Sequence, residues 1–417
     1  MSLIVYALLF LGFFGYLTAS MLMYPRTIVV FLSSILSVII FVVAIFSSIK
    51  IIVFDKSLKN YQVGRMRLIW INFAFLMHST FWLFYSEISL SFLNQDIYGV
   101  LVRILYCVFI PSIGVLIVNR INYSQLRQAF LFFYRAFWII CIIATLQYVV
   151  GEDNLPYFLH SDDRYFISIN ALGKTRVNGL IGNHIEFALS CCLMYYGYFL
   201  FEIHTKKKPH KVSLIDYVFS ALIIMSSSRV FFVIFGALFF VQKMSAQTRR
   251  LKNYAKFIPI VLALFAVGKI SGINTYVYEA LFSPYNWSAM ASTDQHYWEI
   301  TNAIRSIVES PFFGNGVGDQ AGDKSRLVTD GTVWALLVET GLFGTLTLLV
   351  YICTFVSLPI NDENPLSSDY LSIIVLSSLF LSSQLLNSSY MNILNSTLFF
   401  FILSGSFVKR NRKIYAK

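Results

Sequence analysis

The sequence predicts an all-α integral membrane protein, and three observations lead to that prediction. The 417 residues are 57% hydrophobic and only 13% charged, about half of the roughly 25% charge that ordinary soluble domains carry. The mean hydropathy is +0.68. The chain also holds 40 Phe and 25 Tyr, more than a soluble core of this length needs or hides. This composition excludes a soluble enzyme, a disordered protein and a secreted disulfide scaffold.

Long apolar runs predict about twelve transmembrane helices, since one span needs about 20 predominantly apolar residues. The spans are expected at 2–23, 28–48, 68–90, 97–118, 128–150, 179–202, 212–227, 229–243, 257–270, 332–357, 369–386 and 391–408. Spans one to nine then form a bundle over residues 1–270, and spans ten to twelve lie within 332–417. Between them, residues 271–331 are expected to form a large periplasmic loop that contains short amphipathic helices.

The basic residues cluster in alternate connecting segments, which predicts the orientation because cytoplasmic loops carry an excess of Lys and Arg. These residues are Lys50, Lys56, Lys59, Arg65, Arg67, Arg120, Arg127, Lys206, Lys207, Lys208, Lys211, Lys243, Arg249, Arg250, Lys252, Lys256, Lys409, Arg410, Arg412, Lys413 and Lys417. Their alternation places both termini in the cytoplasm. The net charge of +11 is therefore a topology signal, and no ordered basic domain indicates nucleic-acid binding.

The other basic residues gather toward the opposite side of the predicted membrane. They are Arg26, Arg103, Arg135, Arg164, Lys174, Arg176, Arg229, Lys269, Arg305, Lys324 and Arg326, of which all but Arg135 lie outside or in the outer part of a span. Glu87, Glu186 and Glu339 are expected at the same depth. Charges within a bilayer are costly and usually mark a pathway or a site, so we expect a polar site that faces the periplasm.

The sequence of the large loop predicts a helix. Ser292 and Gln295 are spaced as a capping box, and apolar residues at helical spacing continue to about Glu309. Arg305 is expected on the other face of this helix, and Pro311 ends it. The alternative is a membrane-surface helix in which Arg305 pairs with Glu309.

Three alternating glycines, Gly314, Gly316 and Gly318, follow that helix. Consecutive backbone N–H groups in such a segment can converge on an anion, and the guanidinium of Arg305 can bind the same phosphate or pyrophosphate with two nitrogens. A flexible glycine turn without a ligand explains the same residues. No strand and helix flank the segment in the way that a dinucleotide-binding loop requires.

Two further segments carry polar residues into predicted spans. Residues 176–186 enter the sixth span from outside, and residues 226–229 separate spans seven and eight. His184 is explained equally by a helix cap or by a pair with Glu186. The alternative for Arg229 is a side chain that only reaches the lipid headgroups.

The order of these segments resembles the O-antigen ligase and polymerase superfamily, which contains Wzy-type polymerases and WaaL-type ligases. The matching segments are Arg176 with Gly179; Ser227, Ser228 and Arg229; Arg305; Ser310 to Gly318, which read SPFFGNGVG; and Asp330 with Glu339 to Gly344, which read ETGLFG. They cover about residues 176–345, and the first five spans resemble the family in hydropathy alone. Residues 327–332, which precede the tenth span, contain no His where ligases have one, so the resemblance favours a polymerase.

The resemblance implies a glycosyltransferase of the bacterial inner membrane that uses neither a metal nor a cofactor. Its substrates would be oligosaccharide repeat units on undecaprenyl pyrophosphate, its surroundings the membrane lipids, and its partner a chain-length regulator of the polysaccharide co-polymerase type. Cations would stabilise the leaving pyrophosphate, and Arg176, Arg229 and Arg305 are the candidates, with Gly314, Gly316 and Gly318 beside them. Asp330 is the first candidate for the base that accepts the proton of the acceptor hydroxyl, followed by Glu339 and His184.

Two other functions remain open at this stage. A ligase would transfer the glycan to the lipid A core. A repeat-unit flippase would also use about twelve spans, but transporters place charged and broken helices near the midplane, often in paired halves. In this sequence the charges favour one face, and no internal repeat is present.

Overall fold

The computed structural model describes the helical parts of the chain. It covers residues 26–54, 63–92, 103–151, 177–181, 184–201, 213–226, 291–316, 332–356 and 393–410, with short pieces at 7, 154–156, 159, 228, 231–232, 234–236 and 239. Within these residues the ordered elements are helices, and no strand is present. The predicted all-α class is therefore confirmed for this part of the chain. The predicted spans 257–270 and 369–386 lie outside the described residues, as do 2–23 except residue 7 and most of 229–243.

Apart from α14, the described helices follow the predicted apolar runs. They are α3 (Arg26–Phe54), α4 (Val63–Phe92), α6 (Ser112–Arg120), α7 (Tyr123–Val150), α8 (His184–Phe201), α9 (Leu214–Ser226), α14 (Ala291–Glu309), α15 (Thr332–Val356) and α17 (Ile393–Arg410), with a π-helical turn, η3, at Leu105–Phe109. Four of them contain segments long and apolar enough to cross a membrane: Phe31–Val53, Met66–Glu87, Tyr123–Val150 and Val333–Val356. Shorter apolar helices lie at Leu105–Arg120, Leu214–Ser226 and Leu394–Lys409. These helices indicate a membrane protein.

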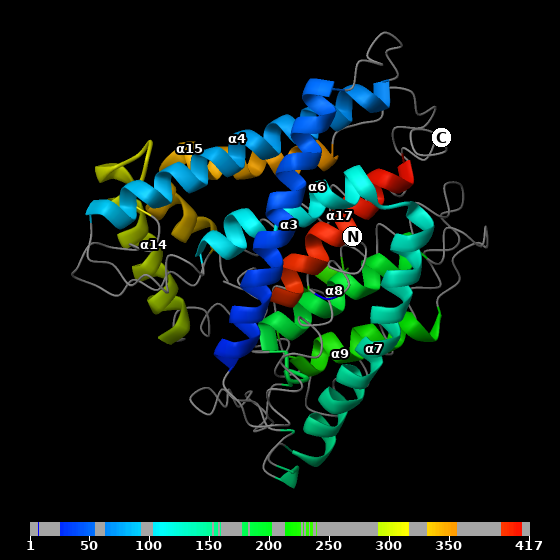
Figure 1. Cartoon of the computed structure of the whole chain (residues 1–417). Coiled ribbons are helices and arrows are strands. Elements are labelled where there is room, and N and C mark those ends of the chain that lie inside the picture. The colour runs from blue at the N-terminus through cyan, green and yellow to red at the C-terminus, as the bar shows by residue number, and fades with distance from the viewer. Residues whose placement is uncertain are drawn as a thin grey trace, which may run out of the picture.

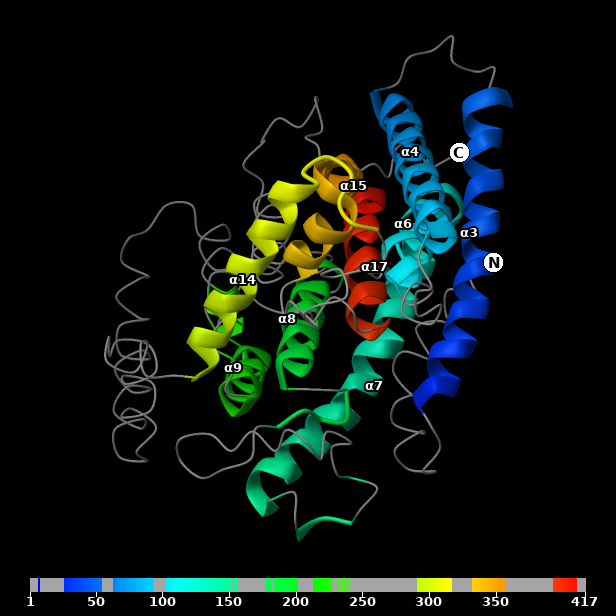
Figure 2. The ribbon, with the colours of Figure 1, turned by 90° about the vertical axis from the view of Figure 1, so that its left-hand side faces the viewer.

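The helices pack into a bundle around α8 and α17 (Figure 1). Most residues of α8 are buried, from Phe187 to Phe201, as expected of a helix that is apolar on every side. Helix α15 runs along α4, and α14 packs against α15 at the edge of the bundle (Figure 2). By contrast, many apolar side chains of α3 face outward, with Phe46 69% exposed, which suits contact with lipid chains.

The predicted fourth span is an interrupted helix. Its described part begins at Arg103 and contains the π-helical turn η3, followed by Pro111. Proline has no N–H to donate to the carbonyl of Cys107, four residues earlier. The Nε2 atom of His78 lies 2.6 Å from that carbonyl oxygen, so Nε2 carries the proton. The fully buried His78 is thus a structural residue.

The predicted helix in the large loop is confirmed, because α14 spans Ala291–Glu309. The apolar residues at helical spacing in α14 are only partly covered. Ala303 is buried, whereas Ile304 and Val308 are 47% and 72% exposed. The helix therefore presents apolar side chains outward beside α15, as a helix at a membrane surface does.

Candidate functional site around the break in helix α15

Helix α15 is broken at Gly341, two residues after Glu339. Gly341 has φ +63° and ψ −163°, which no helix contains. In a regular helix the N–H groups of Leu342 and Phe343 would donate to the carbonyls of Val338 and Glu339. The break therefore leaves two N–H groups and two carbonyls without helical partners, a costly state in an apolar environment.

The loop that follows α14 supplies all four missing partners. The N–H groups of Asn315 and Gly316 donate to the carbonyls of Val338 and Glu339 over 2.8 and 2.9 Å. In return, the N–H groups of Leu342 and Phe343 donate to the carbonyls of Pro311 and Phe312 over 2.9 and 3.1 Å. We call this set of four hydrogen bonds the backbone exchange. It joins segments 310–316 and 338–343, which are two separate parts of the motif order in the sequence.

Two glycines make the backbone exchange possible. A Cβ atom on Gly314 (φ +70°) would lie 2.5 Å from the backbone of Glu339 and Thr340. A Cβ atom on Gly341 would lie 2.4 Å from the backbone of Phe312. Atoms do not approach so closely, and residues with side chains rarely adopt these positive φ angles. Both positions therefore require glycine in this arrangement.

Side chains fix the ends of the loop. Ser310 Oγ and Tyr85 Oη both donate to the carbonyl of Gly314, over 2.8 and 2.9 Å. Asn315 Nδ2 donates to Ser306 Oγ of α14 over 2.7 Å. The ring of Phe313 stacks on Tyr85 with centroids 6.4 Å apart. The loop is thus bound to α4, α14 and α15 at once.

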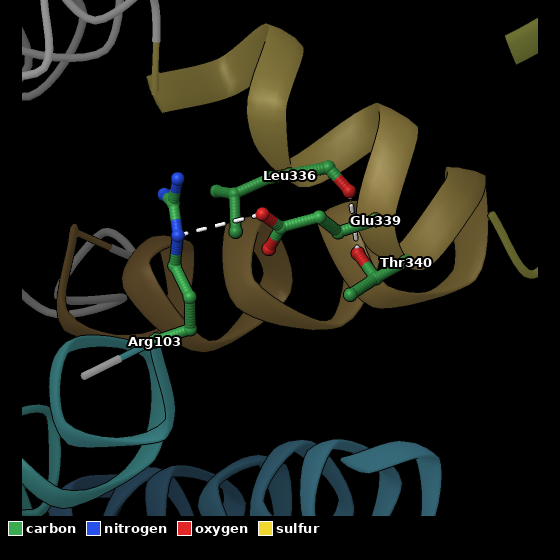
Figure 3. Close-up of polar contacts among 4 residues, drawn as sticks. All are labelled: Arg103, Leu336, Glu339 and Thr340. Carbon is green, nitrogen blue, oxygen red and sulfur yellow. Dashed lines mark hydrogen bonds and ion pairs between the residues drawn. The ribbon is translucent and has the colours of Figure 1, made fainter. Parts of the chain in front are cut away.

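Glu339, whose carbonyl takes part in the backbone exchange, also forms an ion pair with Arg103. The carboxylate of Glu339 is fully buried, and its Oε1 atom lies 3.4 Å from Nε of Arg103, whose side chain is 18% exposed (Figure 3). Arg103 lies two residues before the π-helical turn of the fourth span, and Glu339 lies two residues before the break in α15. The structure thus brings together two of the charges that the sequence placed in the outer parts of spans.

A second signature segment is held by a residue that sequence reasoning missed. Gln147 of α7 is buried, and its Oε1 atom accepts the N–H groups of Asn178 and Gly179 over 3.4 and 3.0 Å. Its Nε2 atom donates to Asn178 Oδ1 over 3.3 Å. Next to them, Leu180 has φ +69°, an angle that leucine rarely adopts. A polar residue in a mostly apolar helix gives no sequence signal for such a partner.

The predicted site residues divide into three groups. Gly314, Gly316 and Glu339 are brought together by the backbone exchange. Arg305 is exposed on α14, and His184 is the half-buried first residue of α8. Asp330, Arg176, Arg229 and Gly318 lie outside the described residues. Their roles stay predictions.

The expected anion nest takes a different form in the described part of the glycine segment. The N–H of Gly314 donates to the carbonyl of Ser310 over 3.0 Å, and the N–H groups of Asn315 and Gly316 are used in the backbone exchange. In this arrangement these three groups point to carbonyl oxygens and do not converge on an anion. Within the residues described, no group of three or more His, Cys, Asp or Glu side chains is placed to hold a metal ion.

In comparisons with known proteins, no family model matches this chain and no curated protein matches it.

Proposed function

We propose that this protein is a polysaccharide polymerase of the bacterial inner membrane. It joins oligosaccharide repeat units carried on undecaprenyl pyrophosphate at the periplasmic face, in the manner of Wzy-dependent O-antigen or capsule synthesis. The observation that carries the proposal is the backbone exchange between segments 310–316 and 338–343. The two segments are separate parts of the motif order that resembles this superfamily. Because they hydrogen-bond to each other, they form one structural unit, which supports reading them as a single motif.

The chemistry follows from what the substrates require. The reducing-end sugar of the growing chain is transferred to a hydroxyl of the incoming repeat unit, and the bond to the lipid pyrophosphate breaks. The hydroxyl loses a proton to a base, with Asp330 the first candidate, and the leaving pyrophosphate takes negative charge that cations stabilise. Arg176, Arg229 and Arg305 are proposed for that task. Apolar side chains on α3, α14 and α15 offer surfaces for the lipid chain.

The test is complementation of a strain that lacks the gene. If the protein is a polymerase, the deletion leaves surface glycan of a single repeat unit, and the wild-type gene restores the ladder of longer chains. Arg305→Ala should reduce chain extension by about 100-fold or more, because a preorganised donor to developing charge has that effect. Arg305→Lys should also be impaired if two guanidinium nitrogens are needed.

Arg120→Ala is the matched control, since Arg120 is exposed at the end of α6 that the charge pattern places in the cytoplasm. Immunoblots must show equal protein in the membrane for every variant. A bare lipid A core with accumulated polymer in the deletion strain would contradict the polymerase assignment and favour a ligase. A full ladder from Arg305→Ala would remove Arg305 from the mechanism.

A further inference from the structure

The buried pair of Arg103 and Glu339 calls for a function beyond stability. Removing two charges from water costs several kcal/mol for each ion, and charged residues within spans usually mark a site. Glu339 is fully enclosed by the protein, whereas part of Arg103 remains accessible. The cation therefore lies between a buried carboxylate and the accessible side.

The guanidinium of Arg103 is oriented with one nitrogen toward Glu339. The Nε atom is the nitrogen that approaches Glu339, and the terminal amino groups point away from the carboxylate (Figure 3). Those two groups hold four of the five N–H donors of an arginine. Planar pairs of such donors bind phosphate oxygens well. The Nε side of the guanidinium thus faces Glu339, and the two terminal amino groups face away from that carboxylate.

The position of Glu339 is itself rigid. Its backbone carbonyl takes part in the backbone exchange, and the break at Gly341 follows two residues later. The residue thus has little freedom to turn toward a sugar hydroxyl. A fully buried carboxylate behind an arginine is better placed to orient that arginine than to accept a proton from a substrate.

We propose that Arg103 binds a phosphate group of the isoprenoid pyrophosphate carrier and that Glu339 is its positioning residue. This inference rests on the proposed function, because it assigns the site to the lipid pyrophosphate of that reaction. It adds Arg103 to the arginines chosen from the sequence. It also replaces the role of base, considered for Glu339, with that of a fixed counter-charge.

The experiment measures binding of farnesyl pyrophosphate to the full-length protein in phosphatidylcholine nanodiscs. Arg103→Ala should raise the dissociation constant at least tenfold, because charge-assisted hydrogen bonds to phosphate are lost. Arg120→Ala, at the other end of the same interrupted span, should leave it within twofold. An unchanged dissociation constant in Arg103→Ala would overturn the proposal.

The positioning role requires its own variants. Glu339→Gln keeps the shape of the side chain but removes the charge, and it should weaken binding several-fold because the guanidinium is no longer held. In the Arg103→Ala background the same change should cause no further loss, since the two residues act together. Equal or tighter binding in the single Glu339→Gln variant would refute positioning, since the lost negative charge alone favours an anion.

A variant that leaves one buried charge alone can fail to fold. The pair is therefore also replaced together, as Arg103→Met with Glu339→Leu, which leaves no charge unpaired. We expect this double variant to fold, as shown by a single peak in size-exclusion chromatography, and to bind as weakly as Arg103→Ala. Wild-type affinity in the folded double variant would overturn the proposal.

Two further measurements are needed. The first distinguishes the carrier pyrophosphate from phospholipid headgroups as the ligand, and the second distinguishes failure of the Arg103 proposal from failure of the proposed polymerase function. Nanodiscs that contain phosphatidylglycerol should not abolish probe binding; if they do, the site binds phospholipid headgroups and the carrier assignment is wrong. Arg103-dependent binding in a protein that extends no glycan would uphold the inference while the proposed reaction fails. If the protein extends glycan chains but binds the probe independently of Arg103, the proposed reaction stands and the role of Arg103 is wrong.

Discussion

At the scale of single residues, the site depends on two places where one backbone touches another. Gly314 and Gly341 lie on opposite partners of the backbone exchange, and each faces the main chain of the other segment. The hydrogen bonds of the exchange form only because no Cβ stands between the chains. The sequence pattern identified both glycines, but it suggested either anion binding or a flexible turn for Gly314 and no purpose for Gly341.

We predict that Gly314→Ala and Gly341→Ala each destabilise the protein by about 2 kcal/mol or more, through backbone strain and overlap. Gly236→Ala is the matched control, because a Cβ at Gly236 meets nothing within 4 Å. Thermal unfolding of the detergent-purified variants provides the comparison. A melting temperature for Gly341→Ala equal to that of the control would show that the break in α15 does not need glycine.

The residue types that sequence reasoning missed share one property. Tyr85 and Gln147 are polar groups in mostly apolar helices, and their partners lie 229 and 32 residues away in the chain. Neither helical spacing nor charge patterning carries information about such distant partners. Glu339 was found because a carboxylate inside a span is conspicuous, but its contact with Arg103 required the folded arrangement.

At the scale of elements, the connection into α8 is a loop held from a neighbouring helix. Gln147 of α7 binds the N–H groups of Asn178 and Gly179, and Leu180 adopts a strained angle beside them. At the start of α8, Asn395 of α17 donates to the carbonyl of Glu186 over 3.0 Å. Two helices, α7 and α17, thus hold the chain just before and at the start of α8.

We predict that Gln147→Ala lowers chain extension through a loop whose buried N–H groups have lost their partner. It should also lower the free energy of unfolding by about 1–3 kcal/mol, the penalty for leaving buried donors unsatisfied. Gln128→Ala, an exposed position on the same helix, should behave as wild type in both assays. If Gln147→Ala and Gln128→Ala give the same glycan ladder and the same stability, the loop is not held by Gln147.

The existence of the described helices could be predicted, whereas their interruptions could not. Apolar runs predicted α3, α4, α7, α15 and α17 to within about six residues at each end because a span must be long and apolar. The break at Gly341 lies within such a run and changes no hydropathy. It is compensated by another segment, so its cause is tertiary and is not contained in the local sequence.

At the scale of the whole molecule, the bundle has one end at which basic residues bind helix carbonyls. Arg127 Nε donates to the carbonyl of Phe201 over 3.1 Å, and Lys409 Nζ donates to that of Leu200 over 2.8 Å. Both cations lie at the C-terminal end of α8, where the helix dipole favours positive charge. The sequence assigned the start of α7 and the end of α17 to the same membrane face, and the structure places them side by side.

The last prediction concerns which membrane face this basic end occupies. The excess of Lys and Arg there predicts the cytoplasm, because positively charged loops are retained on that side. Green fluorescent protein fused after Lys417 should therefore fluoresce, and alkaline phosphatase fused there should be inactive. Alkaline phosphatase fused after Glu309, in the predicted periplasmic loop, should be active and provides the matched control. The opposite pattern at both positions would place Arg103 and the backbone exchange at the cytoplasmic side, where a reaction on periplasmic repeat units is impossible.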